Sequence, residues 1–199
     1  MQLIKNFLLI SLFITPLSSV FCQVKNIGLP EIRNYKRTEY KGEPQNWNID
    51  QDKNGNLYFA NSKGLLQFDG STWRKYTLPN SGLIRSFKID KSGKIFIGSY
   101  SEFGYFKPNS KGKFDYHSLS SLIKKNRIKI IDIIWKIHIH NDEIIFQSFT
   151  SAYIYKNNKL ITLNAPNRFQ FSFQVANRIY FQDIKKGLLE YKNGKLIPL

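Results

Sequence analysis

Short apolar segments alternate with turn residues along the chain, and this pattern recurs four times. In each recurrence three apolar runs follow one another, separated first by a polar turn and then by a turn rich in Gly or Asn. The four units span residues 56–78, 94–119, 143–163 and 178–199. One further alternating run precedes each unit, at residues 47–50, 84–90, 133–140 and 169–175. Because alternation with a period of two is typical of half-buried β-strands, the pattern predicts four strands per repeat.

The spacing of the repeats selects one all-β architecture. The equivalent apolar positions Leu57, Ile95, Ile144 and Ile179 lie 38, 49 and 35 residues apart. Four antiparallel strands in about 40 residues, repeated along a chain, are typical of β-propeller blades. We therefore predict an all-β fold of four four-stranded antiparallel blades that form an incomplete propeller. In the first blade we expect Leu57 and Phe59 to enter the core.

The same repeats divide the chain into segments. We expect a signal peptide at residues 1–22 and a lead-in segment at residues 23–45. The blades are predicted at residues 46–78, 79–119, 120–163 and 164–199, with a long irregular insertion at residues 118–132. This insertion accounts for the longest spacing between repeats.

The first 22 residues have the pattern of a secretory signal. Lys5 precedes an apolar run at residues 7–17, and the small residues Ser18 and Ser19 follow it. This order of a positive, an apolar and a small-residue region is typical of a signal peptide. We expect cleavage after Cys22, the only cysteine, and a lipid on Cys22 is the alternative left open. Either outcome predicts a periplasmic or extracellular protein without a structural disulfide.

The chain is strongly basic, with a formal net charge of +16. Most lysines are scattered singly through turns, and the one tight basic run lies at residues 124–129. Basic charge of this kind favours a solvated surface over a nucleic-acid interface, because no basic helix or zinc motif accompanies it. We therefore expect this segment to contact no nucleic acid.

The turn at residues 50–55 has a composition that is found both in calcium-binding loops and in polar hairpin turns. Asp50, Asp52 and Asn54 alternate before Gly55, which is how a calcium loop begins and how a polar hairpin turn is built. The twelfth position of such a loop is Asn61, where a calcium loop needs a bidentate Glu. The other repeats keep the turn-forming character and lose the oxygen ligands, so the hairpin turn is the favoured interpretation. We predict no metal site.

No catalytic motif is present in the sequence. It has neither a Gly-x-Ser-x-Gly turn nor a phosphate-binding loop. His138 and His140 lie on one face of a strand, a spacing that zinc accepts, but no third ligand is indicated. We expect these histidines to face solvent, and we predict a protein that is not an enzyme and carries no cofactor.

Aromatic and basic residues next to the predicted innermost strands and loops are candidates for ligand binding. Ligands of propellers commonly bind at the mouth of the central channel, on loops. The candidate residues are Trp47, Arg85, Tyr100, Trp135, Phe149 and Arg168. The aromatic members either pack between blades or stack on a ligand such as a sugar ring. The expected partner is an unknown small ligand or glycan.

Two stretches together resemble a known repeat family. They are PQNWNIDQDKNGNLYFANSKGLLQFDGSTW, residues 44–73, and LPEIRNY, residues 29–35. They resemble two-component regulator propeller repeats, which form the secreted sensor region of hybrid histidine kinases and related transcription regulators in Bacteroidetes-type bacteria. The resemblance is strongest over residues 29–107.

The resemblance implies a non-catalytic periplasmic sensor segment that binds a ligand in a two-component signalling protein. It also implies that the chain is the N-terminal part of such a receptor and that a downstream region supplies the membrane tether and the output module. A homodimer through the propeller is a further expectation. Two alternatives are a self-contained extracellular four-bladed binding or adhesion module and a secreted polysaccharide-active enzyme.

Overall fold

The computed structural model describes residues 28, 32–79, 82–123 and 132–199. The chain divides into two compact units, residues 1–34 and residues 35–199, and the helices and strands of the described residues all lie in the second unit. The predicted signal peptide and the basic run at residues 124–129 lie outside the described residues, so both stay predictions. The described part of the chain has no helix with the length and apolar character that a membrane span requires.

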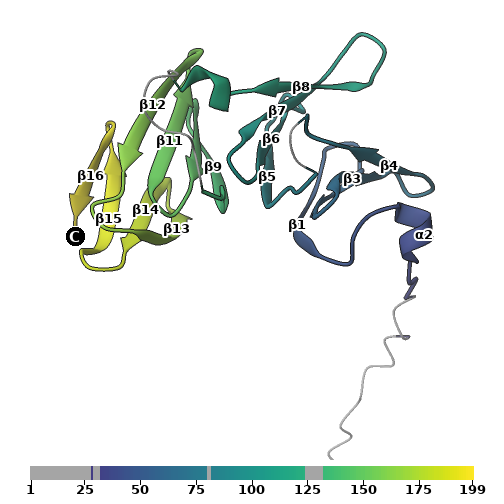
Figure 1. The fold of residues 1–199 in the computed structure, drawn as a ribbon, viewed down its shortest axis with the longest axis horizontal. Coiled ribbons are helices and arrows are strands. Elements are labelled where there is room, and N and C mark those ends of the chain that lie inside the picture. Colours follow the sequence, from purple (N-terminus) through teal and green to yellow (C-terminus); the bar gives the residue numbers. More distant parts are fainter. Residues whose placement is uncertain (1–27, 29–31, 80–81, 124–131) are drawn as a thin grey trace, which may run out of the picture. The chain divides into compact units, whose positions relative to one another are not determined.

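The second unit consists of four four-stranded antiparallel sheets, each with its strands in chain order (Figure 1). The first sheet contains β1 (Asn46–Gln51), β2 (Leu57–Asn61), β3 (Gly64–Phe68) and β4 (Trp73–Tyr76). The second contains β5 (Ser86–Ile89), β6 (Ile95–Gly98), β7 (Phe103–Pro108) and β8 (Phe114–Ser118). The third contains β9 (Lys136–His140), β10 (Glu143–Gln147), β11 (Ser151–Lys156) and β12 (Lys159–Asn164). The fourth contains β13 (Phe169–Val175), β14 (Arg178–Asp183), β15 (Gly187–Lys192) and β16 (Lys195–Pro198).

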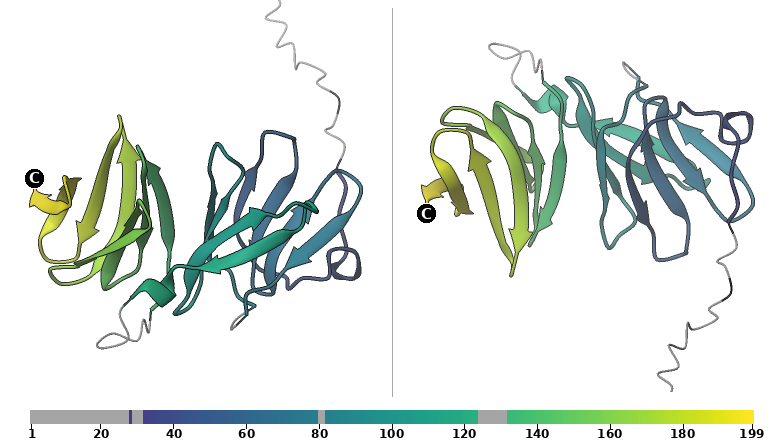
Figure 2. Two further views of the ribbon diagram at one scale, coloured as in Figure 1. Left: turned by 90° about the horizontal axis from the view of Figure 1, so that it is seen from above. Right: turned by 90° about the horizontal axis from the view of Figure 1, so that it is seen from below.

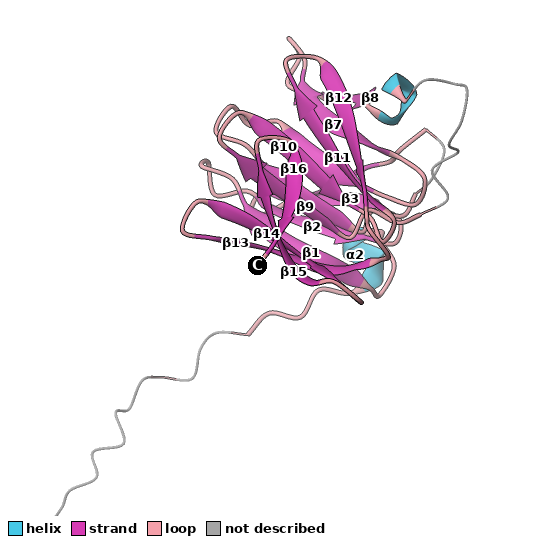
Figure 3. Ribbon diagram, turned by 90° about the vertical axis from the view of Figure 1, so that its left-hand side faces the viewer, coloured by secondary structure: helices cyan, strands magenta, loops and turns pink. Residues whose placement is uncertain are grey.

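Helices are few in the described residues. They are the short α-helix α2 (Arg37–Tyr40) and the 3-10 helix η1 (Ser120–Leu122), drawn in cyan in Figure 3. The 3-10 helix lies within the predicted irregular insertion. The predicted all-β fold with four-stranded antiparallel repeats is therefore confirmed.

Consecutive sheets pack face to face through three apolar clusters, and Figure 2 shows the sheets following one another in chain order. The cluster between the first two sheets includes Tyr58 and Ile97. The next includes Phe103 and Phe146, and the last includes Phe181. The inner sheets are thus covered on both faces, which explains why strand β6 is buried along its whole length.

The burial of strand β2 in the first sheet contradicts one sequence prediction. In strand β2 the buried apolar residues are Tyr58 and Ala60, which pack in the cluster with the second sheet, whereas Leu57 and Phe59 are only partly buried. The ring of Phe59 lies 5.4 Å from that of Trp73 on the other face. Alternation in the sequence identified the two faces correctly and chose the less buried one as the core.

The segment before β1 covers the other face of the first sheet. The ring of Tyr35 lies 5.0 Å from that of Phe68 and 5.4 Å from that of Trp73, both edge to face. Tyr40, at the end of α2, lies 5.7 Å from Trp73. Aromatic contacts of this kind add to the energy of area burial, so these tyrosines hold the segment on the sheet.

The turn between β1 and β2 is built around the carboxylate of Asp52. Its Oδ1 accepts hydrogen bonds from the backbone N–H groups of Asn54 and Asn56, both at 2.9 Å. Its Oδ2 accepts from the Asn56 side chain at 2.8 Å and from the Tyr58 hydroxyl at 3.2 Å. Gly55 has a φ of 86°, which favours glycine. These contacts are those of a hairpin turn, the interpretation that the sequence favoured over a calcium loop.

Metal ligation finds no support in the described residues. No group of three or more His, Cys, Asp or Glu side chains among them is arranged to hold an ion. Burial opposes ionisation of Asp52, but the hydrogen bonds from Asn56, Asn54 and Tyr58 outweigh it and lower the pKa of this carboxyl. The charge of Asp52 is thus stabilised by the turn itself.

Replacing Asp52 by alanine is expected to lower the free energy of unfolding by about 1–3 kcal/mol, because charge-assisted hydrogen bonds to the turn are lost. The measurement is urea denaturation with and without calcium chloride. The control is Lys53→Ala in the same turn, an exposed side chain, which should change stability by less than about 0.5 kcal/mol. A stabilisation of the wild type by calcium that disappears in Asp52→Ala would contradict the hairpin interpretation.

Candidate functional site

The first strands of the four sheets line a common cavity of about 570 Å³. They lie next to one another in the order β1, β5, β9 and β13. Trp47 of β1 and Ser172 of β13 line the wall, together with Arg85 and Trp135, which directly precede β5 and β9. The cavity therefore draws on all four repeats, which lie far apart in the sequence.

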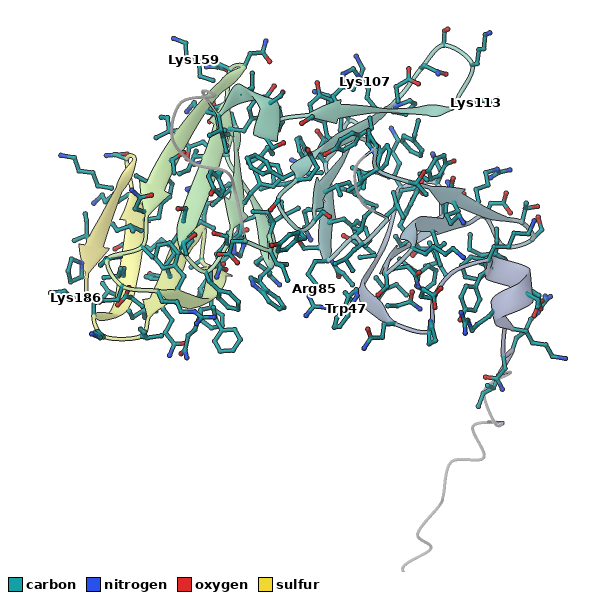
Figure 4. All side chains as sticks on the ribbon, in the orientation of Figure 1. Trp47, Arg85, Lys107, Lys113, Lys159 and Lys186 are labelled. Carbon is teal, nitrogen blue, oxygen red and sulfur yellow. The ribbon has the colours of Figure 1, made fainter. Side chains whose placement is uncertain are left out.

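Cationic and aromatic side chains form a continuous stack in and beside this cavity. The guanidinium carbon of Arg85 lies 3.3 Å from the ring centroid of Trp47 and 4.3 Å from that of Trp135. The ring of Trp135 lies 4.9 Å from that of Phe149. The guanidinium carbon of Arg168 in turn lies 4.2 Å from the Phe149 ring. We call these five residues the Arg–aromatic stack, and Figure 4 labels Trp47 and Arg85 in it.

The stack separates two hollows. On one side is the cavity between the first strands, and on the other is a more apolar pocket of about 780 Å³. Trp135 borders both, and Phe149, Arg168 and Phe173 line the second. A ligand in either hollow would therefore contact a ring and a positive charge.

The indole N–H groups and the arginines of the stack differ in what they offer to a ligand. The indole Nε1 of Trp135 is buried and has no hydrogen-bond partner among the described residues, whereas that of Trp47 donates to Ser62 at 3.1 Å. Burial lowers the pKa of the Arg85 guanidinium, yet an arginine stays charged at neutral pH. The site thus offers positive charge beside aromatic faces, whereas the N–H of Trp135 is covered by the protein.

A buried network of hydrogen-bonded polar side chains lies between the third and fourth sheets. The Nε2 of His138 lies 2.7 Å from the Oγ of Ser172, which donates to the Oε1 of Gln147 at 2.5 Å. All three side chains are buried. The prediction that His138 faces solvent is therefore wrong, because strand β13 of the next sheet covers it. His140 is partly buried, and its Nδ1 has no partner in the described residues.

The structure brings together five of the six predicted site residues. Tyr100 is the exception: its backbone forms an isolated bridge with Ile133, its side chain is 48% exposed, and it lines neither hollow. Sequence reasoning missed Ser172 and Phe173 of β13, which line both hollows. The only signal for them was the alternating aromatic run in that strand.

Comparison with known proteins addresses the fold. No family model matches the chain, and no curated protein matches it at a significant level. Several solved structures do match. The extracellular domain of BT4673 from B. thetaiotaomicron, described as a hybrid two component system, is 18% identical with a TM-score of 0.58. The match covers 77% of this chain and 21% of that one.

Virginiamycin B lyase from Staphylococcus aureus is 12% identical with a TM-score of 0.61, over 82% of this chain and 57% of the lyase. The WD40 β-propeller domain of Doa1 is 13% identical with a TM-score of 0.56, over 78% of this chain and 54% of that one. The chain folds as β-propeller blades. It spans between about a fifth and three fifths of these similar structures.

The comparisons correct the expectation that the chain is not an enzyme. The similar structures include a streptogramin B lyase and an ancestral GH74 enzyme as well as the BT4673 domain. Propeller blades of this kind are thus compatible with enzymatic activity. The absence of a recognisable motif in the sequence was not sufficient ground for excluding it.

Proposed function

We propose that residues 35–199 are a ligand-binding propeller segment of an extracellular sensor, and that the Arg–aromatic stack binds the ligand. The observation that carries the proposal is Arg85 held between Trp47 and Trp135 at the wall of a shared cavity. The signal-peptide pattern and the similarity to an extracellular domain of a two-component system support a place outside the cytoplasm. Side chains from all four repeats would then contact one ligand.

The chemistry of the stack favours a cyclic ligand with oxygen acceptors, such as a sugar ring. Aromatic faces bind the apolar face of a ring, and a few polar groups fix its orientation. The guanidinium groups of Arg85 and Arg168 supply such donors. Tyr100 stays a predicted member of the site that lies outside the stack.

Replacing Arg85 by alanine is expected to weaken ligand binding about tenfold or more, because desolvated cation–π and charge-assisted contacts are lost. The probes are labelled neutral and acidic oligosaccharides, and the measurement is quenching of tryptophan fluorescence in the full chain. Arg37→Ala is the matched control, because Arg37 is exposed, pairs with Glu43 at 2.8 Å and lines none of these hollows. Equal loss of binding in both variants, or saturable binding that Arg85→Ala leaves unchanged, would contradict the proposed site.

A further inference from the structure

A second groove lies between the first two sheets, at the end where their hairpin turns meet. It has a volume of about 700 Å³ and is lined by the β1–β2 turn, the β5–β6 turn and the β7–β8 turn. We call it the turn groove. Figure 4 places Lys113 of the β7–β8 turn well away from Trp47 and Arg85. The groove shares no lining residue with the cavity at the Arg–aromatic stack.

The turn groove carries positive charge that the protein does not neutralise. Lys53, Lys111 and Lys113 line it, and all three side chains are exposed. None of them has an ion-pair partner within the described ranges. The carboxylate of Asp52 also lines the groove, but it is occupied by four hydrogen bonds within its own turn.

Aromatic rings line the groove beneath these lysines. The ring of Phe114 lies 6.4 Å from that of Tyr58 and 5.0 Å from that of Tyr76. The Tyr58 hydroxyl donates to Asp52, and the Tyr76 hydroxyl donates to Gln67 at 2.8 Å. Tyr58 is buried, whereas Tyr76 and Phe114 are partly exposed and offer apolar surface to an occupant.

The equivalent grooves between the later sheets provide an internal comparison. In the groove between the second and third sheets, Lys156 pairs at 3.0 Å with Asp142 of its own sheet. The groove between the third and fourth sheets is lined by two pairs, each within one sheet: Arg178 with Glu190 at 3.5 Å and Lys156 with Glu143 at 3.6 Å. The turn groove is lined by four basic residues and one acidic residue, against three and two in the groove between the second and third sheets and three and three in the groove between the third and fourth. A general excess of lysine does not explain this difference.

We propose that the turn groove is a second binding site, for an organic polyanion that carries sulfate or phosphate groups on a ring. Lysine ammonium groups act as point charges that suit the tetrahedral oxyanions of sulfate and phosphate, whereas planar carboxylates favour the fork of arginine. The three lysines contact the anionic groups, and Tyr76 and Phe114 contact the ring. This site is independent of the one proposed at the Arg–aromatic stack.

The test measures binding of two probes to the full chain by calorimetry: sucrose octasulfate for sulfate and inositol hexakisphosphate for phosphate. Sucrose and inositol are the uncharged controls. The triple variant Lys53→Gln, Lys111→Gln, Lys113→Gln removes the charge of the turn groove. The triple variant Lys159→Gln, Lys192→Gln, Lys195→Gln is matched in charge, because it removes three exposed lysines of the third and fourth sheets.

We expect at least one anionic probe to bind, and the groove variant to bind it about tenfold or more weakly, since three charge contacts are lost. The charge-matched variant should bind within about threefold of the wild type, and added salt should weaken wild-type binding. The probe that binds more tightly identifies sulfate or phosphate as the source. Equal weakening in both triple variants, or no binding of either probe to the wild type, would overturn the proposal. Arg85→Ala should leave this binding unchanged, which separates its failure from that of the stack.

Discussion

Replacing Phe146 by alanine is expected to lower the free energy of unfolding by about 3–5 kcal/mol, because a large buried ring is removed from between two sheets. Phe146 is fully buried in strand β10. Its ring lies 4.7 Å from that of Phe103 and 6.2 Å from that of Phe96, both in the second sheet. A loss of this size is a large fraction of the about 5–15 kcal/mol that stabilises a typical domain.

The measurement is urea denaturation followed by tryptophan fluorescence. Ile161→Ala is the control in the same sheet, because Ile161 lies on strand β12 and is 54% exposed. It should cost less than about 0.5 kcal/mol. A cost of less than about 1.5 kcal/mol for Phe146→Ala would show that the contact between the second and third sheets contributes little to stability.

The local part of this fold could be predicted from the sequence. Strand period and turn chemistry depend on residues that are close along the chain, as the Asp52 and Gly55 turn shows. The hydrogen bonds of that turn all end within the turn or in the next strand. Local signals were therefore sufficient to identify the hairpins and the four-stranded repeats.

The packing between sheets could not be predicted in the same way. Alternation cannot show which face of a strand is buried more deeply when both faces are covered, and so Tyr58 and Ala60 were missed in favour of Leu57 and Phe59. The burial of His138 has the same cause, since Ser172 comes from a strand of the next sheet. Such contacts depend on the relative position of two sheets.

Part of the candidate site could be predicted from local signals, and part depends on the packing between sheets. Its aromatic and basic residues were found because each lies next to an innermost strand, in an inter-blade loop or in the turn after a unit's first strand, which repeat periodicity locates. That Arg85 lies between two tryptophan rings was not predictable, because Trp47 and Trp135 belong to different sheets. Tyr100 satisfied the same positional rule and yet lies outside the stack, because its backbone pairs with Ile133.

The buried position of His138 leads to the second large expected effect, a loss of stability in mild acid. Burial, followed by the positive charges of Lys136 and Lys88 and the neighbouring His140, lowers the pKa of His138 from 6.5 to about 4. Its Nε2 is 2.7 Å from the Ser172 hydroxyl, so its neutral form is held within a hydrogen-bonded network. The unfolded chain has no such environment, and its histidine binds a proton near pH 6.5.

Since the unfolded state binds more protons than the folded state between these two pKa values, stability rises with pH across this window. The contribution of neutral His138 is fully present above about pH 6.5 and is lost as the pH falls through 6.5 towards 4. Lowering the pH from about 7 to about 5 is therefore expected to cost about 2 kcal/mol of unfolding free energy at this residue.

The test compares urea denaturation at both pH values for the wild type, His138→Gln and His117→Gln. Glutamine cannot titrate in this range and keeps a polar group next to Ser172, so His138→Gln should lose most of the pH dependence. His117 is exposed on strand β8, and its replacement should leave the pH dependence as in the wild type. If His138→Gln loses as much stability in acid as the wild type does, the acid sensitivity comes from other groups and His138 is not its source.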